Sequence, residues 1–331
     1  MAVQLLQSVV RSGFVVPLIV AACVPTVLAA EAAANYPTKP VRIIIANTTG
    51  TSVDTLARVL AVKMGDMLGQ QMVADNRGGA GGIIGAEITA NAAPDGYTLL
   101  VSSTGMQVIT PQLYKKLAYE PIRSFAMISM FAVTQNMMVT HPGVPAANVK
   151  ELLAYARANP GRLNMSNAGT GFQSHLAGVL FTHMTGIDVR HVPYKGGASL
   201  IAVMGNESQF TIAPAPAVMA HVRGGRLKAL GTGGEKRSPL TPDLPAINET
   251  VPGYVSTGWS GLMAPRGTPK SILDKLHATL AKALADGPTK EALERQGGEP
   301  WLTSPQEMQG YIEADYKRFA QAIKIANLQP Q

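Results

Sequence analysis

The chain contains 331 residues, of which 46% are hydrophobic and 15% are charged. This length and composition suit two domains with sizeable apolar cores, and they exclude a mainly disordered chain. The formal net charge is +7, but the positive residues are scattered and aromatic residues make up only 5%. That pattern argues against a nucleic-acid partner and leaves a mild attraction for anions.

The first thirty residues fit an export signal. They contain Arg11, an apolar stretch at 14–30 and the segment Val27-Leu28-Ala29, which fits the small-residue rule of signal peptidase for cleavage after residue 29 or 30. Two prolines inside the stretch, and no basic residue at its end, argue against a membrane anchor. The single cysteine, Cys23, excludes an intrachain disulfide, and its position after small residues also leaves a lipoprotein signal open. We expect residues 1–30 to be a signal peptide.

Strand and helix patterns then alternate, which is typical of α/β folds with mostly parallel sheets. Val41–Ala46 reads as a buried parallel strand, and the helix after it has an apolar stripe that starts at Leu56 and ends before Gly69. Ile128–Thr140 is apolar enough for one or two strands that cross between domains. The other expected strands are 71–74, 97–101, 163–166, 189–192, 210–213 and 227–231, and the other expected helices end near 92 or span 149–158, 172–185, 271–286 and 305–326.

The same strand–loop–helix unit occurs once in each half. Apolar residues recur at offsets 0, 3, 4 and 8 from Leu56 and again from Leu176. The first loop follows a buried strand and opens a helix, where free N–H groups and the helix dipole favour an anion such as a carboxylate. Its candidate ligand contacts are Thr48, Thr49, Gly50, Thr51 and Ser52.

Asp54 lies three residues after Thr51, which is capping-box spacing. In such a box, Thr51 accepts from the third helical N–H and Asp54 reaches back to the Thr51 N–H. Capping alone is the preferred reading for Asp54, because a carboxylate repels an anionic ligand unless it orients neighbouring groups.

The matching loop in the second half, Asn167–His175, contains two glycines that permit a close approach of backbone to a ligand. Thr170 and Gln173 again have capping-box spacing, and His175 is expected to be solvated or hydrogen-bonded rather than a base. Paired with the first loop, this segment predicts a two-sided clamp. Its candidate contacts are Ala168, Gly169, Thr170, Gly171, Phe172, Gln173 and Ser174.

Three further strand ends carry candidate contacts. Ser102, Ser103 and Thr104 offer small donors, with ordinary turn chemistry as the alternative. Tyr194 can lay its ring along a ligand or wedge the domain interface, and Pro214 can shape a pocket wall.

Enzyme and cofactor motifs are scarce. The glycine-rich segment 76–82 has Ile84 where a dinucleotide fingerprint needs glycine, and the sequence contains neither a P-loop nor an HExxH motif. Gly258–Gly261 lacks nucleophile-elbow spacing, and the six histidines show no metal-ligand pattern. We expect no catalytic residue, metal or cofactor, although a triad assembled across the fold keeps a secreted hydrolase as the rival reading.

Six phrases, in this order, closely resemble the extracytoplasmic solute receptors of tripartite tricarboxylate transporters, the Bordetella uptake gene (Bug) family. They are Tyr36–Arg42, Asp54–Arg58, Asn76–Gly82, Ala93–Leu100, His191–Gly196 and Gly258–Pro265. The resemblance covers about residues 36–330.

The resemblance implies a type II-like periplasmic binding protein fold, an α/β fold of two Rossmann-like lobes joined by two crossovers with a ligand cleft between them. Lobe 1 would be 31–131 plus 256–331, and lobe 2 would be 132–255. Such a receptor acts in the periplasm, as a monomer, and delivers a small carboxylate to a two-subunit membrane permease. In the family, the loop before the Asp54 helix and the loop matching Asn167–Ser174 hold the ligand carboxylate, often with ordered waters.

Two segments depart from the family pattern. The first loop, Ala46–Thr51, lacks the usual prolines and Gly-Gly pair, and Glu207–Pro216 also differs. The ligand class therefore stays open among dicarboxylates, tricarboxylates, amino acids and aromatic acids, and so does a receptor that serves signalling without transport.

Overall fold

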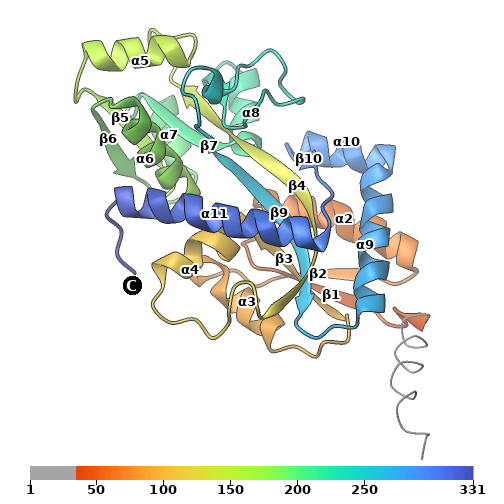
Figure 1. Cartoon of the computed structure of the whole chain (residues 1–331). Coiled ribbons are helices and arrows are strands. Elements are labelled where there is room, and N and C mark those ends of the chain that lie inside the picture. Colours follow the sequence, from red (N-terminus) through yellow and green to blue (C-terminus); the bar gives the residue numbers. More distant parts are fainter. Residues whose placement is uncertain (1–34, 331) are drawn as a thin grey trace, which may run out of the picture.

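In the computed structural model, which describes residues 35–330, ten strands form one curled sheet with helices on both faces (Figure 1). The strand order is β2-β1-β3-β9-β4-β7-β5-β6, and β8 and β10 also pair with β4. The strands are β1 Val41–Ile45, β2 Met72–Asn76, β3 Thr98–Ser103, β4 Phe125–Thr140, β5 Leu163–Asn167, β6 Val189–Pro193, β7 Phe210–Pro214, β8 Lys228–Thr232, β9 Thr257–Pro265 and β10 Glu299–Pro300. The expected signal peptide and Cys23 lie outside the described residues.

The α-helices are α2 Ser52–Leu68, α3 Ile83–Ala90, α4 Thr110–Leu113, α5 Val149–Ala158, α6 Gln173–Thr185, α7 Ala198–Met204, α8 Ala215–Arg223, α9 Lys270–Ala285, α10 Gly287–Arg295 and α11 Pro305–Ile325. Short turns of other helix types are η1 Ala80–Gly82, η2 Gly105–Ile109 and η3 Ile247–Glu249. Within 35–330, no helix is both long and apolar enough to cross a membrane.

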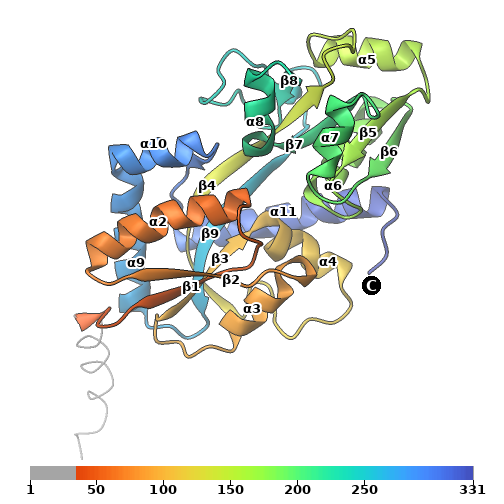
Figure 2. The ribbon, with the colours of Figure 1, turned by 180° about the vertical axis from the view of Figure 1, so that it is seen from behind.

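β4 belongs to both halves of the molecule. The sequence predicted one or two strands that cross between domains, and the structure has a single strand of 16 residues here. From Phe125 to Gln135 it pairs antiparallel with β9, and from Asn136 to Thr140 it pairs antiparallel with β7. Figure 2 shows β4 and β9 running side by side between the two groups of helices. The two halves are therefore joined through these two strands.

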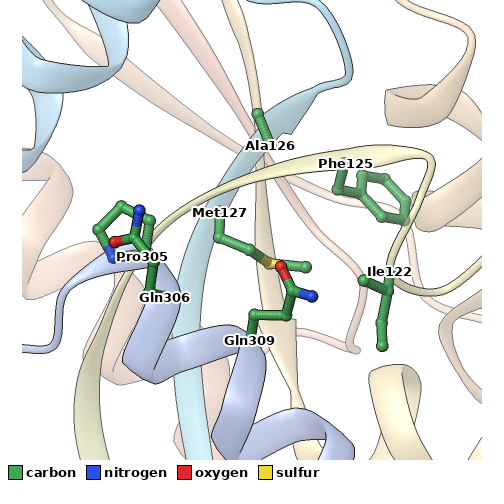
Figure 3. A pocket seen from close by; sticks show the side chains of 7 residues that line it. All are labelled: Ile122, Phe125, Ala126, Met127, Pro305, Gln306 and Gln309. Carbon is green, nitrogen blue, oxygen red and sulfur yellow. The ribbon is translucent and has the colours of Figure 1, made fainter.

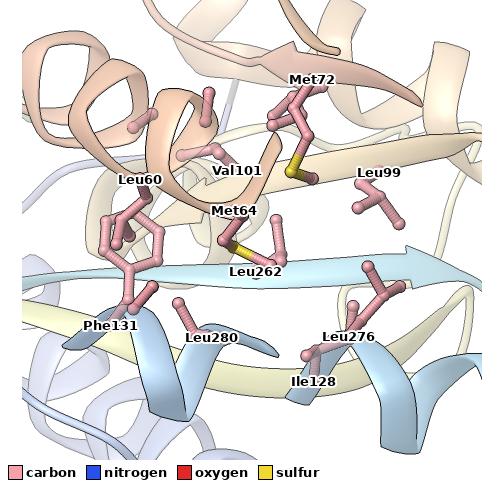
Figure 4. Packing of buried hydrophobic residues seen from close by; sticks show 14 of the residues in the cluster. Leu60, Met64, Met72, Leu99, Val101, Ile128, Phe131, Leu262, Leu276 and Leu280 are labelled. Carbon is pink, nitrogen blue, oxygen red and sulfur yellow. The ribbon is translucent and has the colours of Figure 1, made fainter. Parts of the chain in front are cut away.

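The first half has a core between the sheet and two helices on one face. The predicted stripe of α2 places Leu56, Leu60 and Met64 in this core, each at most 4% exposed. Leu276 and Leu280 of α9 complete it (Figure 4). Gly69 ends α2 with φ of 69°, a left-handed conformation that glycine adopts without a steric penalty.

The sequence did not predict the helical segments η2 with α4, α7, α8, η3 and α10. α7 has only seven residues, and α10 buries only Thr289 and Leu293. Segments this short, or with so narrow a buried face, show little helical periodicity. They nevertheless matter for the site, because η2 with α4 and α8 follow the carboxyl ends of β3 and β7.

Candidate functional site

The carboxyl ends of strands from both halves point toward the crossover. Ser103, the last residue of β3, lies opposite Ser260 of β9, which pairs with Ala132 of β4. Pro214, the last residue of β7, lies opposite Asn136 of β4. The two β4 residues, Ala132 and Asn136, are four residues apart along the strand, which is about 13 Å. β1 runs parallel to β3, and β5 runs parallel to β7, so all four carboxyl ends meet this junction.

Loops from opposite halves are anchored on the same segment of β9. The Thr104 hydroxyl, just after β3, accepts from the Trp259 N–H at 2.9 Å. Gln173 Nε2, at the start of α6, donates to the Thr257 carbonyl at 2.8 Å. Two segments that are far apart in the sequence are thus held two residues apart on one strand, beside the junction.

The loop after β5 also lies against the first half. Gly171 has φ of +81°, and a Cβ built on it would lie 2.9 Å from Leu113 Cδ1 of α4. Both views show α6 beside α11, with α4 close by (Figures 1 and 2). Gly171 therefore meets both requirements for glycine, a left-handed backbone and a close approach.

The first loop is held by Asp54, although not in the predicted way. Thr51 caps α2, accepting from the Asp54 N–H at 3.4 Å. The Asp54 carboxylate accepts from the Gly50 N–H at 2.8 Å and not from the Thr51 N–H, which donates to the Thr48 carbonyl instead. The reach-back predicted for this capping box was wrong by one residue, because the left-handed Gly50 turns its own N–H toward Asp54.

Asp54 is buried, with 2% exposure, and its charge is fully engaged. Its Oδ1 accepts from Asn76 Nδ2 and from Arg58 Nε, each at 2.9 Å. Burial alone would raise the pKa of Asp54, but the bonds from Gly50, Asn76 and Arg58 together hold that pKa below its ordinary value. Sequence reasoning had not assigned Asn76 and Arg58 a role here, although both lie in phrases that carry the family resemblance.

The predicted capping box at Thr170 and Gln173 is wrong. Phe172 is the N-cap residue of α6, and Gln173 is the first helical residue, with its side chain committed to β9. The loop is organised by neutral acceptors instead. The N–H groups of Ala168, Gly169 and Gly171 donate to Ser174 Oγ, Asn167 Oδ1 and His175 Nδ1, at 3.0, 3.1 and 3.2 Å.

His175 is hydrogen-bonded, as expected, and it stacks edge-on against His191 with ring centroids 5.9 Å apart. Burial lowers the pKa of His175. Burial and then the charge of His175 lower the pKa of His191 to about 4. Near neutral pH both rings are therefore uncharged, which leaves His175 Nδ1 free to accept from the loop.

The candidate contacts differ in how far a solute can reach them. Thr48, Thr49, Gly50 and Thr170 are exposed, and Phe172 is 60% exposed. Partly exposed are Thr51, Ser52, Ala168, Gly169, Gln173, Tyr194 and Pro214. Buried are Ser102, Ser103, Thr104, Gly171 and Ser174. Among the buried residues, Ser102 donates its hydroxyl to Gln107 Oε1, so this hydroxyl stabilises the end of β3.

Two cavities lie away from these loops. One, of about 240 Å³, opens beside the start of α11 and is lined by Phe125, Met127 and Gln309 among others (Figure 3). The other, of about 530 Å³, lies between α8 and α10. No residue of the two loops lines either cavity.

Comparisons with known proteins agree on one family. The family model described as the tripartite tricarboxylate transporter family receptor matches residues 56–328. Protein BugT of Bordetella pertussis is 34% identical over 301 residues, which cover 90% of this chain and 92% of BugT.

Two solved structures from Rhodopseudomonas palustris share the fold. Rpa4515 with adipate superimposes with a TM-score of 0.80 at 33% identity, over 89% of this chain and 100% of that one. MatC with bound malate has a TM-score of 0.73 at 28% identity, over 87% of this chain and 100% of that one. Both ligands are small carboxylates.

Proposed function

This chain belongs to the tripartite tricarboxylate transporter receptor family, and from that premise we propose that it captures a small carboxylate between its lobes and delivers it to a membrane permease of two subunits. Receptors of this family are periplasmic binding proteins. The adipate and malate held by the two solved relatives support a carboxylate of similar size for this chain.

The observation that carries the proposal is the meeting of four strand ends from both halves at the crossover. The helix starts that follow β1 and β5 offer N–H groups, and Thr48, Thr49, Ser52 and Thr170 add hydroxyls. When the lobes close over a carboxylate, water leaves, and each of these hydrogen bonds becomes stronger in the drier site. Arg58 is committed to Asp54 and Asn76, so neutral donors do most of the binding.

The proposed lobes are 31–131 with 256–331, and 132–255. The change of β4 partners between Gln135 and Asn136 supports a hinge four residues beyond the first boundary. The bond from the Asn136 N–H to the Ser256 carbonyl, at 3.1 Å, supports the second boundary.

The remaining parts of the proposal follow from the sequence. We propose that residues 1–30 are a signal peptide, that the receptor acts as a monomer, and that it binds without a cofactor and catalyses no reaction. The absence of catalytic motifs and the binding proteins among its relatives support the last point.

The test is a thermal-shift screen with adipate, malate, citrate, glutamate and benzoate, followed by calorimetry on the acids that raise the melting temperature. At least one acid should bind, and Thr49→Ala with Thr170→Ala should weaken it by about 1–3 kcal/mol. Thr185→Ala is the matched control, since this threonine lies at the opposite end of α6 and bonds within the helix. Binding unchanged in the double variant would remove both loops from the site.

A further inference from the structure

A carboxylate joins the two lobes at a point outside the candidate ligand site. Glu299 of β10 belongs to the first lobe, and its Oε1 accepts from Gln135 Nε2 at 2.9 Å and from the Ser238 hydroxyl. Gln135 is the last residue of β4 that pairs with β9, and its Oε1 accepts from the Gly234 N–H at 3.1 Å. Ser238 and Gly234 follow β8, in the second lobe. These three side chains, Glu299, Gln135 and Ser238, are called the clasp below.

The backbone beside the clasp is closely packed and leaves no space for a side chain at Gly233. The Gly233 N–H donates to the Asn136 carbonyl at 2.7 Å, and the Ser256 N–H donates to the Gly233 carbonyl at 2.7 Å. A Cβ built on Gly233 would lie 2.2 Å from the Ser256 carbonyl oxygen. The crossover itself is therefore tightly packed, and the angle between the lobes depends on contacts to either side of it.

Space for movement exists next to the clasp. All three clasp residues line the cavity of about 530 Å³ between α8, in the second lobe, and α10, in the first. Figure 2 shows α8 beside the upper part of β4 and α10 beside its lower part. A rotation of the lobes changes the distance between α8 and α10, and it stretches or breaks the bond between Ser238 and Glu299.

The position of the Glu299 carboxylate disfavours its charged form. Burial raises the pKa of Glu299, and the bonds from Ser238 and Gln135 only partly oppose that rise. Glu299 is half-buried, and its partners are Ser238 in the other lobe and Gln135 at the hinge. The strength of these bonds therefore depends on the angle between the lobes, and the bonds in turn favour one angle.

We propose that Glu299 is a positioning residue that sets the resting angle between the lobes, so that a carboxylate that does not touch the ligand tunes the affinity for it. This inference rests on the proposed function. The apparent affinity of a receptor scales with the fraction of molecules in the binding-competent arrangement. A hydrogen bond to a charged acceptor is strong enough to change that fraction about tenfold.

Two variants test the clasp in the full exported chain. Ser238→Ala removes the second lobe's donor to Glu299, together with the acceptor of the Leu240 N–H at 3.2 Å, and Glu299→Gln removes the charge. Glu291→Gln is the matched control, because Glu291 lines the same cavity and pairs with Arg295 on its own helix. Ser238→Thr restores a hydroxyl and should restore the unmodified behaviour.

The readouts are the lobe separation without ligand and the dissociation constant. Spin labels at Val62→Cys on α2 and Ile201→Cys on α7, both more than 60% exposed, report the separation by pulsed dipolar spectroscopy. Ser238→Ala and Glu299→Gln should shift the distance distribution and change the dissociation constant for the acid found in the screen about tenfold. Binding should be tighter if the mean separation falls and weaker if it rises.

Folded variants with unchanged distances and unchanged affinity would overturn the proposed role of the clasp, and so would equal effects from Glu291→Gln. A change in melting temperature alone would also overturn it, since that is what a merely structural role predicts. If no acid binds even the unmodified chain, the proposed function fails, whereas the distance measurement still decides the clasp.

Discussion

The two helices that follow the candidate loops have one apolar spacing and two different environments. In α2, Leu56, Leu60 and Met64 all lie in a single core within the first lobe. In α6, Leu176 packs with the core of α11 and Trp259 in the first lobe, whereas Phe181 packs in the second. The comparison shows that periodicity does not reveal which half of the molecule covers a face, and in α6 it also predicted the face only in part, because Met184 of the stripe is 38% exposed whereas Phe181, outside it, is buried.

The two loops are also stabilised in different ways. The first is held by the charge of Asp54, with Asn76 and Arg58. The second is held by neutral acceptors, among them Ser174 and His175. We infer that the first loop depends on one ionised group, and that the second depends on contacts with its surroundings in both lobes.

The largest expected loss of stability comes from the apolar stripes of α2 and α6. Leu60→Ala and Leu176→Ala should each lower the free energy of unfolding by about 2–5 kcal/mol, because each empties a fully enclosed site. Only Leu176→Ala should also alter the lobe separation measured by spin labels, since Leu176 connects the lobes. Equal separations in the two variants would show that α6 does not bridge them.

The next largest effect comes from removal of the Asp54 charge, which holds the first loop. Asp54→Asn should cost about 2 kcal/mol of stability and weaken carboxylate binding, because the Gly50 N–H loses a charged acceptor. Ser174→Ala is the counterpart in the second loop and should cost about 1 kcal/mol, since that bond is neutral. Urea unfolding and calorimetry measure both, and a larger cost for Ser174→Ala would reverse the comparison.

A comparison of two glycine variants tests the contact between the second loop and α4. Gly171→Ala should cost about 1 kcal/mol more than Gly196→Ala, because both have positive φ but only Gly171 has Leu113 within 4 Å. Urea unfolding measures the difference. Equal costs would mean that the loop does not rest on α4.

A pH dependence that arises in the second lobe also distinguishes the two regions. Since the pKa of His191 is lowered from 6.5 to about 4, the stability it contributes is present above pH 6.5 and is lost as the pH falls toward 4. The pKa of Asp54 is lowered below 3.8, so its contribution is lost only in stronger acid. His191→Gln should therefore reduce the slope of the unfolding free energy between pH 6.5 and 4 and leave the part due to His175, whose pKa burial also lowers, and Asp54→Asn should leave the slope unchanged.

Local patterns predicted most of the regular structure and only part of the site. Strand β1 lies where an apolar run indicated it, and helix α5 has the range that was expected for it. The capping spacing at Thr170 failed, because Gly169 and Gly171 turn the chain and Gln173 finds its partner on β9, 84 residues away. Distant partners of this kind leave no local pattern, so the direct contacts in the site remain predictions.

The path of β9 has a consequence for how the molecule is made. The first lobe cannot complete its sheet until β9 is available, and β9 pairs with β3 more than 150 residues earlier in the chain. Contacts so distant carry a large loop-closure cost and slow the search for the native arrangement. β3 therefore lacks its β9 neighbour until the last quarter of the polypeptide is available.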